Sequence, residues 1–296
     1  MVSGERCVSR GQLYKKIIGI LEKSGMDRFD AYCIFESAFG DVFPRIMMDR
    51  TLDVPAEISD KILAMTEKRC QGYPLQYIIG SWEFLGYEFK VGEGVLIPRP
   101  DTETLVIQVR DICLSRGLKA PRIADLCSGS GCIAISLKLW FPGAEVYAVE
   151  LSDKALSYLR ENTRLNNGAD IHIVQADVLD EKTARSISDL DIIVSNPPYL
   201  TAEEMNDLQT EVSFEPEAAL FGGADGLDFY REITRIWRAS LKEGGFLAYE
   251  FGLGQHEDVS RILRENGFSN IQLSRDTAGI IRTAAAQKFT EDIHNG

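Results

Sequence analysis

The sequence lacks long apolar runs and an excess of positive charge. No stretch approaches the roughly 18 uncharged apolar residues of a transmembrane helix, and residues 1–6 lead into no apolar core of signal-peptide length. The chain has 32 Lys and Arg against 45 Asp and Glu, a net charge of −13, which repels nucleic-acid backbones at long range. We therefore expect a cytoplasmic protein with no membrane segment and no direct nucleic-acid binding.

Histidine and cysteine lack the spacing of a metal site, a catalytic triad or a disulfide framework. The three histidines are His172, His256 and His294, which lie too far apart in sequence to suggest a zinc site or a Ser-His-Asp triad. The six cysteines are Cys7, Cys33, Cys70, Cys113, Cys127 and Cys132. They lack the spacing of a disulfide framework or of a C-x-x-C metal clip. We expect reduced thiols and no bound metal.

The chain length of 296 residues corresponds to about two domains. Apolar residues recur at helical spacing over residues 11–72, and the period changes to two between Trp82 and Val91. Asp101 then follows a Pro-Arg-Pro segment as a predicted N-cap. The sequence predicts a helical domain over residues 1–78, a β-hairpin linker over 79–97 and a second domain over 98–296.

The second domain alternates strand-like and helix-like segments, which is typical of an α/β fold with a doubly wound, mostly parallel, Rossmann-like sheet. The predicted parallel strands are residues 123–126, 145–149, 171–174, 191–194 and 246–251. Two further segments, 270–274 and 280–285, are predicted as an antiparallel edge pair.

A glycine-containing loop follows the first predicted strand, where doubly wound sheets bind nucleotides. Its residues are Cys127, Ser128, Gly129, Ser130 and Gly131. Glycines permit a tight turn and close approach of a ligand, although Cys127 occupies the first glycine site of the G-x-G-x-x-G pattern. Asp125 precedes the loop, and its carboxylate could face a ligand's ammonium group. The loop therefore favours S-adenosylmethionine over a dinucleotide.

Two acidic residues follow the next predicted strands. Glu150 lies 19 residues after Gly131, where a carboxylate can accept hydrogen bonds from both ribose hydroxyls. The alternative is that Glu150 merely caps the next helix. Asp177 and its neighbour Val178 are predicted to contact the adenine, with a solvated loop as the alternative for Asp177.

The fourth strand runs directly into Asn196-Pro197-Pro198-Tyr199. Two prolines fix the backbone and remove two N–H donors, so the turn presents rigid acceptors beside an aromatic ring. The Asn196 oxygen and the Pro197 carbonyl could accept both N–H groups of a planar nitrogen and direct it at a sulfonium methyl group, while Tyr199 packs against the substrate plane. The alternative is an ordinary Pro-Pro turn.

This turn resembles that of class I S-adenosylmethionine-dependent methyltransferases that act on planar nitrogens. Longer segments are similar to the peptide chain release factor glutamine methyltransferases, over residues 10–285. They are Gly-Tyr-Pro-Leu-Gln-Tyr-Ile at 72–78, Gly-Val-Leu-Ile-Pro-Arg-Pro-Asp-Thr-Glu at 94–103, Glu-Pro at 215–216, Ala-Leu-Phe-Gly-Gly at 219–223 and Asp-Gly-Leu at 225–227.

The resemblance implies methylation at N5 of the glutamine in the Gly-Gly-Gln motif of class 1 release factors, with the helical domain helping to hold this partner. The predicted cofactor-binding residues are Asp125, Cys127, Ser128, Gly129, Ser130, Gly131, Glu150, Asp177, Val178 and Asn196. The predicted substrate-binding residues are Asn196, Pro197, Pro198 and Tyr199, of which Asn196, Pro197 and Tyr199 are predicted to be catalytic. This sequence departs from the family at Cys127, commonly glycine, and at Glu150, commonly aspartate.

Two other functions remain open from the sequence. An adenine or cytosine amino-methyltransferase acting on DNA or RNA would use the same turn on a flipped base, but the negative charge and the absence of a basic, aromatic-rich insertion disfavour it. A catalytically silent binding module is the second alternative. The long acidic segment 201–226 is predicted to be a substrate-contacting lid, with a solvated insertion as the alternative.

Overall fold

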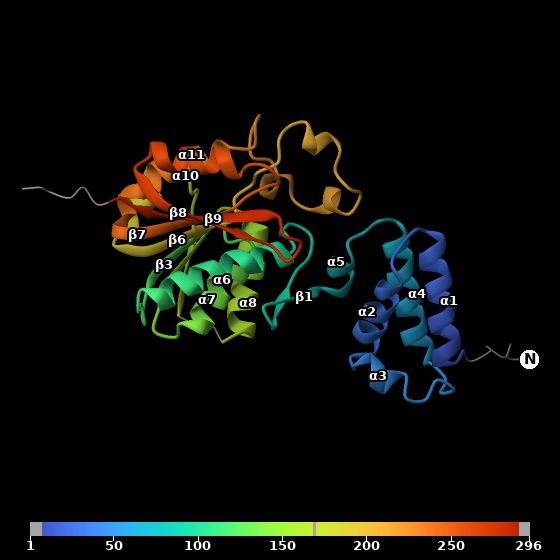
Figure 1. Cartoon of the computed structure of the whole chain (residues 1–296). Helices are drawn as coiled ribbons and strands as arrows, with labels where there is room; N and C mark the ends of the chain where they lie inside the picture. Colours follow the sequence, from blue (N-terminus) through green and yellow to red (C-terminus); the bar gives the residue numbers. More distant parts are fainter. Residues whose placement is uncertain (1–7, 168–169, 290–296) are drawn as a thin grey trace, which may run out of the picture. The chain divides into compact units, whose positions relative to one another are not determined.

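The computed structural model describes residues 8–167 and 170–289, and the chain divides into two compact units (Figure 1). The first unit holds the chain up to residue 81 together with residues 209–214, and the second holds the rest. Cys7, His294 and the opening residues 1–6 lie outside the described residues. Within those described, no helix combines the length and the apolar character needed to cross a membrane.

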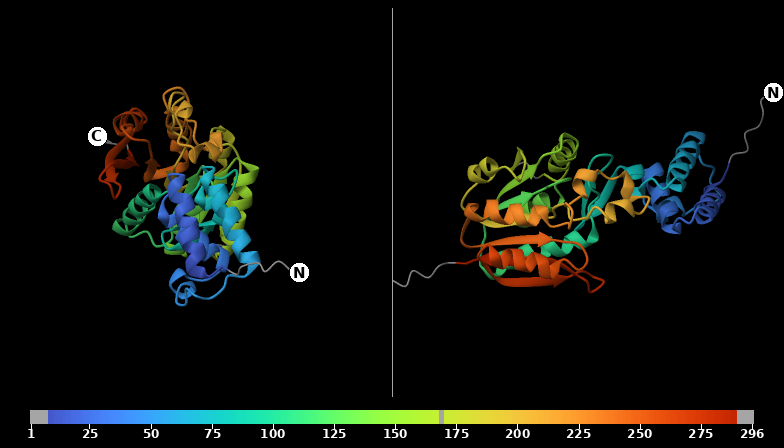
Figure 2. Two further views of the ribbon diagram at one scale, coloured as in Figure 1. Left: turned by 90° about the vertical axis from the view of Figure 1, so that its right-hand side faces the viewer. Right: turned by 90° about the horizontal axis from the view of Figure 1, so that it is seen from above.

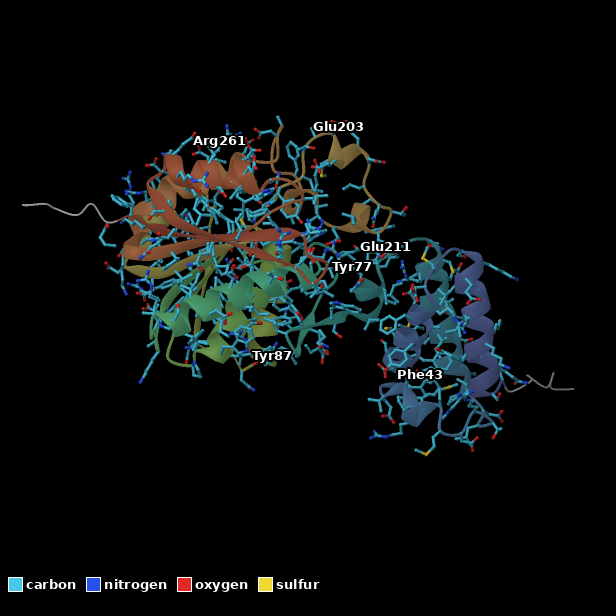
Figure 3. All side chains as sticks on the ribbon, in the orientation of Figure 1. Phe43, Tyr77, Tyr87, Glu203, Glu211 and Arg261 are labelled. Carbon is cyan, nitrogen blue, oxygen red and sulfur yellow. The ribbon has the colours of Figure 1, made fainter. Side chains whose placement is uncertain are left out.

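The first unit is built from helices packed around an aliphatic and aromatic core. Its helices are α1 (Arg10–Lys23), α2 (Arg28–Phe39), α3 (Phe43–Ile46), α4 (Ala56–Cys70) and α5 (Leu75–Ile79). Ser9 and Gln12 form a capping box at the start of α1, and Asp27 caps α2 through the amide of Phe29. The ring of Phe43 packs 4.8 Å from the ring centroids of both Tyr14 and Tyr32 (Figure 3).

A buried arginine fastens residues 209–214 to the helices of the first unit. Arg69 on α4 pairs with Asp30 on α2 at 2.6 Å and with Glu211 at 2.6 Å. The side chains of Arg69 and Asp30 are each 7% exposed, so the opposite charge of the partner, and not water, stabilises each charge. Phe214 packs edge-on against Tyr73 with ring centroids 5.0 Å apart.

The second unit contains a short hairpin and a seven-stranded sheet in the order β5-β4-β3-β6-β7-β9-β8. The hairpin strands are β1 (Ser81–Phe84) and β2 (Tyr87–Lys90). The sheet strands are β3 (Arg122–Leu126), β4 (Glu145–Glu150), β5 (Ile171–Gln175), β6 (Leu190–Ser195), β7 (Leu241–Glu250), β8 (Phe268–Arg275) and β9 (Ile281–Lys288). Strands β3 to β7 pair in parallel, whereas β9 is antiparallel to β7 and to β8. The two red strands close one edge of the sheet (Figure 2).

Helices cover both faces of the sheet because successive strand residues face opposite sides. On β6, Ile192 and Val194 join a core with α6 (Pro100–Ser115), α7 (Cys132–Trp140) and α8 (Asp153–Leu165). Ile193 points the other way, into a core with α9 (Glu181–Ser186), α10 (Asp228–Trp237) and α11 (His256–Glu265). Figure 1 shows α6, α7 and α8 on one side of the sheet and α10 and α11 on the other.

The predicted doubly wound sheet, its antiparallel edge and the helical N-terminal region are confirmed. The predicted N-cap of α6 is wrong. Arg99 occupies the cap position and Asp101 lies inside the first turn, because the fixed φ of Pro100 suits the first helical position. Helix α9 was not predicted, since its six residues are too few to show an apolar period.

Asn162 on α8 ties the hairpin to the glycine loop. Its Oδ1 accepts from the backbone N–H of Lys90 at 2.6 Å, and its Nδ2 donates to the carbonyls of Lys90 at 3.0 Å and Ser130 at 2.9 Å. The side chain is fully buried, so these backbone groups depend on Asn162 for their hydrogen bonds.

We expect Asn162→Ala to lower the free energy of unfolding by about 3 kcal/mol, because it leaves the buried carbonyl of Ser130 and two half-buried backbone groups of Lys90 unsatisfied. Urea unfolding followed by circular dichroism measures this loss. Asn166→Ala is the matched control, because Asn166 is the C-cap of α8 four residues later, is only half-buried and bonds the carbonyl of Glu88. Its cost should stay below about 1 kcal/mol, and equal losses in the two variants would contradict the assignment.

Candidate active site

The parallel register brings the predicted site residues to one edge of the sheet. Leu126, the last residue of β3, pairs with Val149 on β4 and with Ser195, the last residue of β6. The Ser195 hydroxyl also donates to the Leu126 carbonyl at 2.7 Å. Because parallel strands end on the same side, the segments that follow them emerge side by side. The glycine loop after β3 and the Asn-Pro-Pro-Tyr turn after β6 are therefore neighbours, at the point where the strand order reverses.

The glycine loop folds through three residues in the left-handed region, at Cys127 (φ 61°), Gly129 (φ 54°) and Gly131 (φ 83°). A side chain at Gly131 would come within 2.2 Å of Leu159, so this glycine lets the loop pack on α8. A Cβ at Gly129 would meet nothing within 4 Å. The backbone at Gly129 thus borders open space, as a loop that receives a ligand must.

Asp125 lies fully buried behind the loop. Its Oδ2 accepts from the backbone N–H of Ala134 at 3.1 Å, whereas Oδ1 has no partner. Burial raises the pKa of Asp125 to about 8, against the lowering effect of hydrogen bonds from Ser128 and Ala134. An unpartnered buried carboxylate oxygen beside the loop fits a ligand that carries an ammonium group, such as S-adenosylmethionine.

Glu150 ends β4 and bonds the glycine loop directly. Its Oε2 accepts from the backbone N–H of Gly129 at 2.8 Å, and its Oε1 accepts from that of Ser152 at 2.8 Å. The N-cap of α8 is Ser152, whose hydroxyl accepts from Ala155, so the alternative that Glu150 caps this helix is wrong. Each carboxylate oxygen keeps a further lone pair that can accept from a ribose hydroxyl.

Asp177 and Val178 follow β5 at the same edge, where β5 pairs with β4. Asp177 is exposed and its Oδ1 accepts from the backbone N–H of Leu179 at 2.8 Å. Val178 is buried, and its carbonyl accepts from the indole of Trp237 at 2.8 Å. The structure thus brings both residues to the predicted side of the sheet, and their contact with an adenine stays a prediction.

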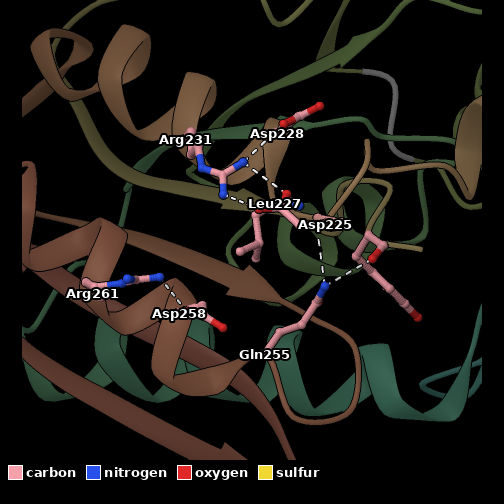
Figure 4. A network of polar contacts seen from close by, with 9 residues as sticks. Asp225, Leu227, Asp228, Arg231, Gln255, Asp258 and Arg261 are labelled. Carbon is pink, nitrogen blue, oxygen red and sulfur yellow. Dashed lines mark hydrogen bonds and ion pairs between the residues drawn. The ribbon is translucent and has the colours of Figure 1, made fainter. Parts of the chain in front are cut away.

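The Asn-Pro-Pro-Tyr turn is held from several sides. Asn196 is half-buried, and its Nδ2 donates to the hydroxyl of Thr102 on α6 at 3.3 Å. The Tyr199 carbonyl accepts from Gln255 Nε2 at 3.1 Å, and the same amide reaches the Gly226 carbonyl at 3.4 Å (Figure 4). A side chain at Gly226 would come within 2.3 Å of the Tyr199 carbonyl. These contacts fix the backbone that carries the predicted acceptors.

Tyr199 is half-buried and packs against the core beside α10 and α11. Burial raises the pKa of its phenol well above the ordinary value, so the hydroxyl stays protonated and does not act as a general base. Burial likewise raises the pKa of the Cys132 thiol to about 12. Within residues 8–167 and 170–289, no cluster of His, Cys, Asp or Glu is arranged to hold a metal.

The segment 201–226 is rooted beside the turn at both ends. Leu200 donates to the Leu220 carbonyl and accepts from Gly222, each at 2.8 Å. Near its end, Asp225 forms an ion pair with Arg231 on α10 (Figure 4). Whether this segment acts as a lid stays a prediction.

Arg99 anchors this segment. Its guanidinium pairs with Glu215, a buried carboxylate that also accepts from the backbone N–H of Ile97 at 3.0 Å.

Sequence reasoning missed three polar residues at the site, Thr102, Gln255 and Glu250. Glu250 ends β7, and the parallel pairing of β7 with β6 carries it to the same edge as Asn196. Its position next to the end of the predicted strand 246–251 was the feature of the sequence that could have indicated it. Thr102 and Gln255 lie in or beside helices, where nothing in the sequence pattern distinguishes them from helix-terminal polar residues.

Comparisons with known proteins now identify the family. The Methyltransferase small domain family matches residues 106–220, and the PrmC N-terminal domain family matches residues 12–80. A release factor glutamine methyltransferase from Fusobacterium nucleatum is 36% identical over 280 residues, which cover 93% of this chain and 78% of the relative. The chain belongs to the release factor glutamine methyltransferase family. A family member from Geobacter sulfurreducens is 35% identical, covering 91% of this chain and 93% of the relative.

The solved structures support the fold. The hMettl16 catalytic domain, solved in complex with MAT2A 3'UTR hairpin 6, superposes with a TM-score of 0.56. The match covers 79% of this chain and 82% of that chain, at 17% sequence identity. This likeness shows the fold of the sheet unit. The matching methyltransferase domain and the named relatives imply S-adenosylmethionine as the methyl donor, which the loop and Asp125 fit.

Cys127 allows a test of the loop conformation. A non-glycine residue in the left-handed region costs about 1–2 kcal/mol, and a β-branched residue tolerates it least. We expect Cys127→Gly to keep the affinity for S-adenosylmethionine within about 3-fold, because only the backbone conformation is needed. Cys127→Val should weaken binding by about 10-fold or more. Isothermal titration calorimetry measures both, and equal affinities in the two variants would contradict a role for this backbone conformation in binding.

Proposed function

We propose that this protein transfers a methyl group from S-adenosylmethionine to N5 of the glutamine in the Gly-Gly-Gln motif of class 1 peptide chain release factors. The observation that carries the proposal is the adjacency of the glycine loop and the Asn-Pro-Pro-Tyr turn, which follow paired strands β3 and β6. A methyl donor held by the loop and an amide held by the turn would then meet at one edge of the sheet. The family membership supplies the substrate.

The loop geometry supports the proposed cofactor residues. In this proposal, Cys127 to Gly131 receive the cofactor along their backbone, Asp125 faces its ammonium group, and Glu150 accepts from its ribose hydroxyls. Asp177 and Val178 lie at the adenine. When bound, S-adenosylmethionine supplies an electrophilic methyl group on a positively charged sulfur.

The substrate residues act on an amide nitrogen whose lone pair is delocalised. In this proposal, Asn196 Oδ1 and the Pro197 carbonyl accept the two N–H groups of the glutamine side chain. Accepting both protons raises electron density on nitrogen and fixes its direction. Pro198 keeps the turn rigid and the ring of Tyr199 packs against the amide plane. Methylation leaves the nitrogen with an acidic proton that water can accept, so no strong general base is required.

The alternative of a DNA or RNA amino-methyltransferase is not favoured. The curated relatives described above are named for release factors, and the matching PrmC N-terminal domain covers the helical region. The net charge of −13 also disfavours a nucleic-acid substrate.

A labelling experiment tests the substrate. The full-length protein is incubated with methyl-labelled S-adenosylmethionine and a class 1 release factor, beside the same factor with its Gly-Gly-Gln glutamine changed to alanine. We expect about one methyl group per molecule of the unaltered factor and none on the altered one, because the glutamine amide is the proposed acceptor. Label retained on the altered factor would show that the proposed acceptor is wrong.

Asn196→Ala tests the turn. We expect kcat to fall by about 10²- to 10³-fold, as for the loss of one preorganised hydrogen-bonding group in a site, while the cofactor dissociation constant stays within about 3-fold. Steady-state kinetics and calorimetry measure the two quantities. Asn166→Ala removes a similar amide far from this edge and should retain normal turnover. Near-normal activity in Asn196→Ala would contradict the amide-holding role.

A further inference from the structure

Glu250 is a buried carboxylate that the proposed mechanism does not use. It is the last residue of β7, is 2% exposed, and its Oε2 has no hydrogen-bond partner. Burying a carboxylate in this way is costly, and the adjacent strand β6 leads directly into Asn196. A buried carboxylate with one unsatisfied oxygen at this position calls for a physical explanation.

Glu250, Thr102 and Asn196 form one hydrogen-bonded cluster. The hydroxyl of Thr102 and the amide of Asn196 face the Glu250 carboxylate, and hydrogen bonding by these two groups lowers its pKa. Asn196 Nδ2 also donates to Thr102 Oγ1 at 3.3 Å. Thr102 is 2% exposed, so solvent does not compete for these groups. The two neighbours that hold the Asn196 side chain are therefore a hydroxyl and a carboxylate.

An ionised carboxylate offers only acceptors. When ionised Glu250 takes the single proton of the Thr102 hydroxyl, Thr102 has only acceptor lone pairs left toward Asn196, in agreement with the bond from Asn196 Nδ2 to Thr102 Oγ1. The Thr102 hydroxyl and the Glu250 carboxylate then both act as acceptors toward Asn196. The Asn196 amide can donate to them only when its NH₂ group is turned toward them. Its oxygen must point the other way. A protonated or amidated residue at position 250 would offer a donor, and the flipped amide would be equally well bonded.

We propose that ionised Glu250, acting together with Thr102, orients the side-chain amide of Asn196 so that its oxygen faces the substrate amide. Glu250 and Thr102 are positioning residues, because they touch Asn196 and act through it. The inference rests on the proposed function, in which Asn196 Oδ1 accepts a proton of the substrate. Without this constraint, a flipped Asn196 would present a donor to a substrate N–H and repel it.

The protonation of Glu250 makes this orientation depend on pH. Burial raises the pKa of Glu250 to about 7, with a further increase from Asp101 on α6, while Arg282 on β9 and the hydrogen bonds from Thr102 and Asn196 lower it. The other titratable groups facing it are the phenols of Tyr199 and Tyr230 and the thiol of Cys132. Burial raises the pKa of each of these three groups, so they remain neutral near pH 7. A raised carboxyl pKa means that Glu250 gains its proton as the pH falls through about 7, and turnover should fall with it.

The experiment compares full-length wild type, Glu250→Gln, Thr102→Val and Thr102→Ser with methyl-labelled S-adenosylmethionine and a release factor between pH 5.5 and 9. We expect kcat in Glu250→Gln to fall by about 10- to 100-fold, the cost of a misplaced catalytic group. The fall of kcat below about pH 7, which is the acidic limb of the wild-type pH profile, should disappear in this variant. Thr102→Val should lose about 10-fold, and Thr102→Ser, which keeps the hydroxyl, should recover to within about 3-fold of wild type. Calorimetry should give a cofactor dissociation constant within about 3-fold of wild type for every variant.

Glu243→Gln is the matched control, because Glu243 lies on the same strand but is exposed and pairs with Lys288. It should keep both kcat and the acidic limb. Wild-type kcat and an unchanged acidic limb in Glu250→Gln would overturn the inference. Parallel losses of cofactor affinity and thermal midpoint, with no recovery in Thr102→Ser, would also overturn it by showing a merely structural role. An inactive wild type would instead contradict the proposed function, and this inference with it.

Discussion

The parallel pairing of β3 with its two neighbours is the constraint on which the site depends. Leu126 is in register with Val149 on one side and Ser195 on the other. The segments that follow β3, β4 and β6 therefore begin next to one another at the same edge of the sheet. Each strand is buried on both faces by helices, and a one-residue slip would exchange the residues that face the two cores. The packing of the whole unit therefore fixes the relative positions of the loop, Glu150 and Asn196 before any ligand arrives.

Buried and half-buried carboxylates hold irregular backbone in the second unit. Glu150 bonds the loop backbone at Gly129, Glu215 bonds the backbone at Ile97, and Asp125 bonds the first turn of α7. A carboxylate accepts several N–H groups at once, so it can hold irregular backbone that no strand or helix satisfies. The acidic composition of the chain is thus in part a structural requirement of its loops, in addition to its effect on which partners approach.

Much of this arrangement could be predicted from the sequence, because the signals were local. The strands around the site have short apolar runs, and the glycine loop and the Asn-Pro-Pro-Tyr turn are contiguous motifs. The resemblance to a family supplied the substrate, which no local pattern contains. Thr102 and Glu250 could not be linked to Asn196 in this way. They come from α6 and β7, and only the three-dimensional fold places them around one amide.

Other features escaped prediction for different reasons. The start of α6 was misjudged because a good capping residue, Asp101, follows a proline that initiates the helix by itself. Gln255 bonds two backbone carbonyls, those of Tyr199 and Gly226. Every residue type has a backbone carbonyl, so the sequence does not indicate which carbonyls Gln255 will bond. The fold followed from composition and periodicity, whereas the supports of the site followed from tertiary geometry.

The division of the chain into its two units is not a division of the sequence into two halves. Residues 209–214 belong to the helical unit, although the chain on either side of them belongs to the methyltransferase unit. Removing residues 1–81 would therefore strip Glu211 and Phe214 of the Arg69 and Tyr73 that they contact. A single cut in the chain therefore cannot separate the two units. During synthesis on the ribosome, more than a hundred residues are added after residue 81 before residues 209–214 can join the helical unit.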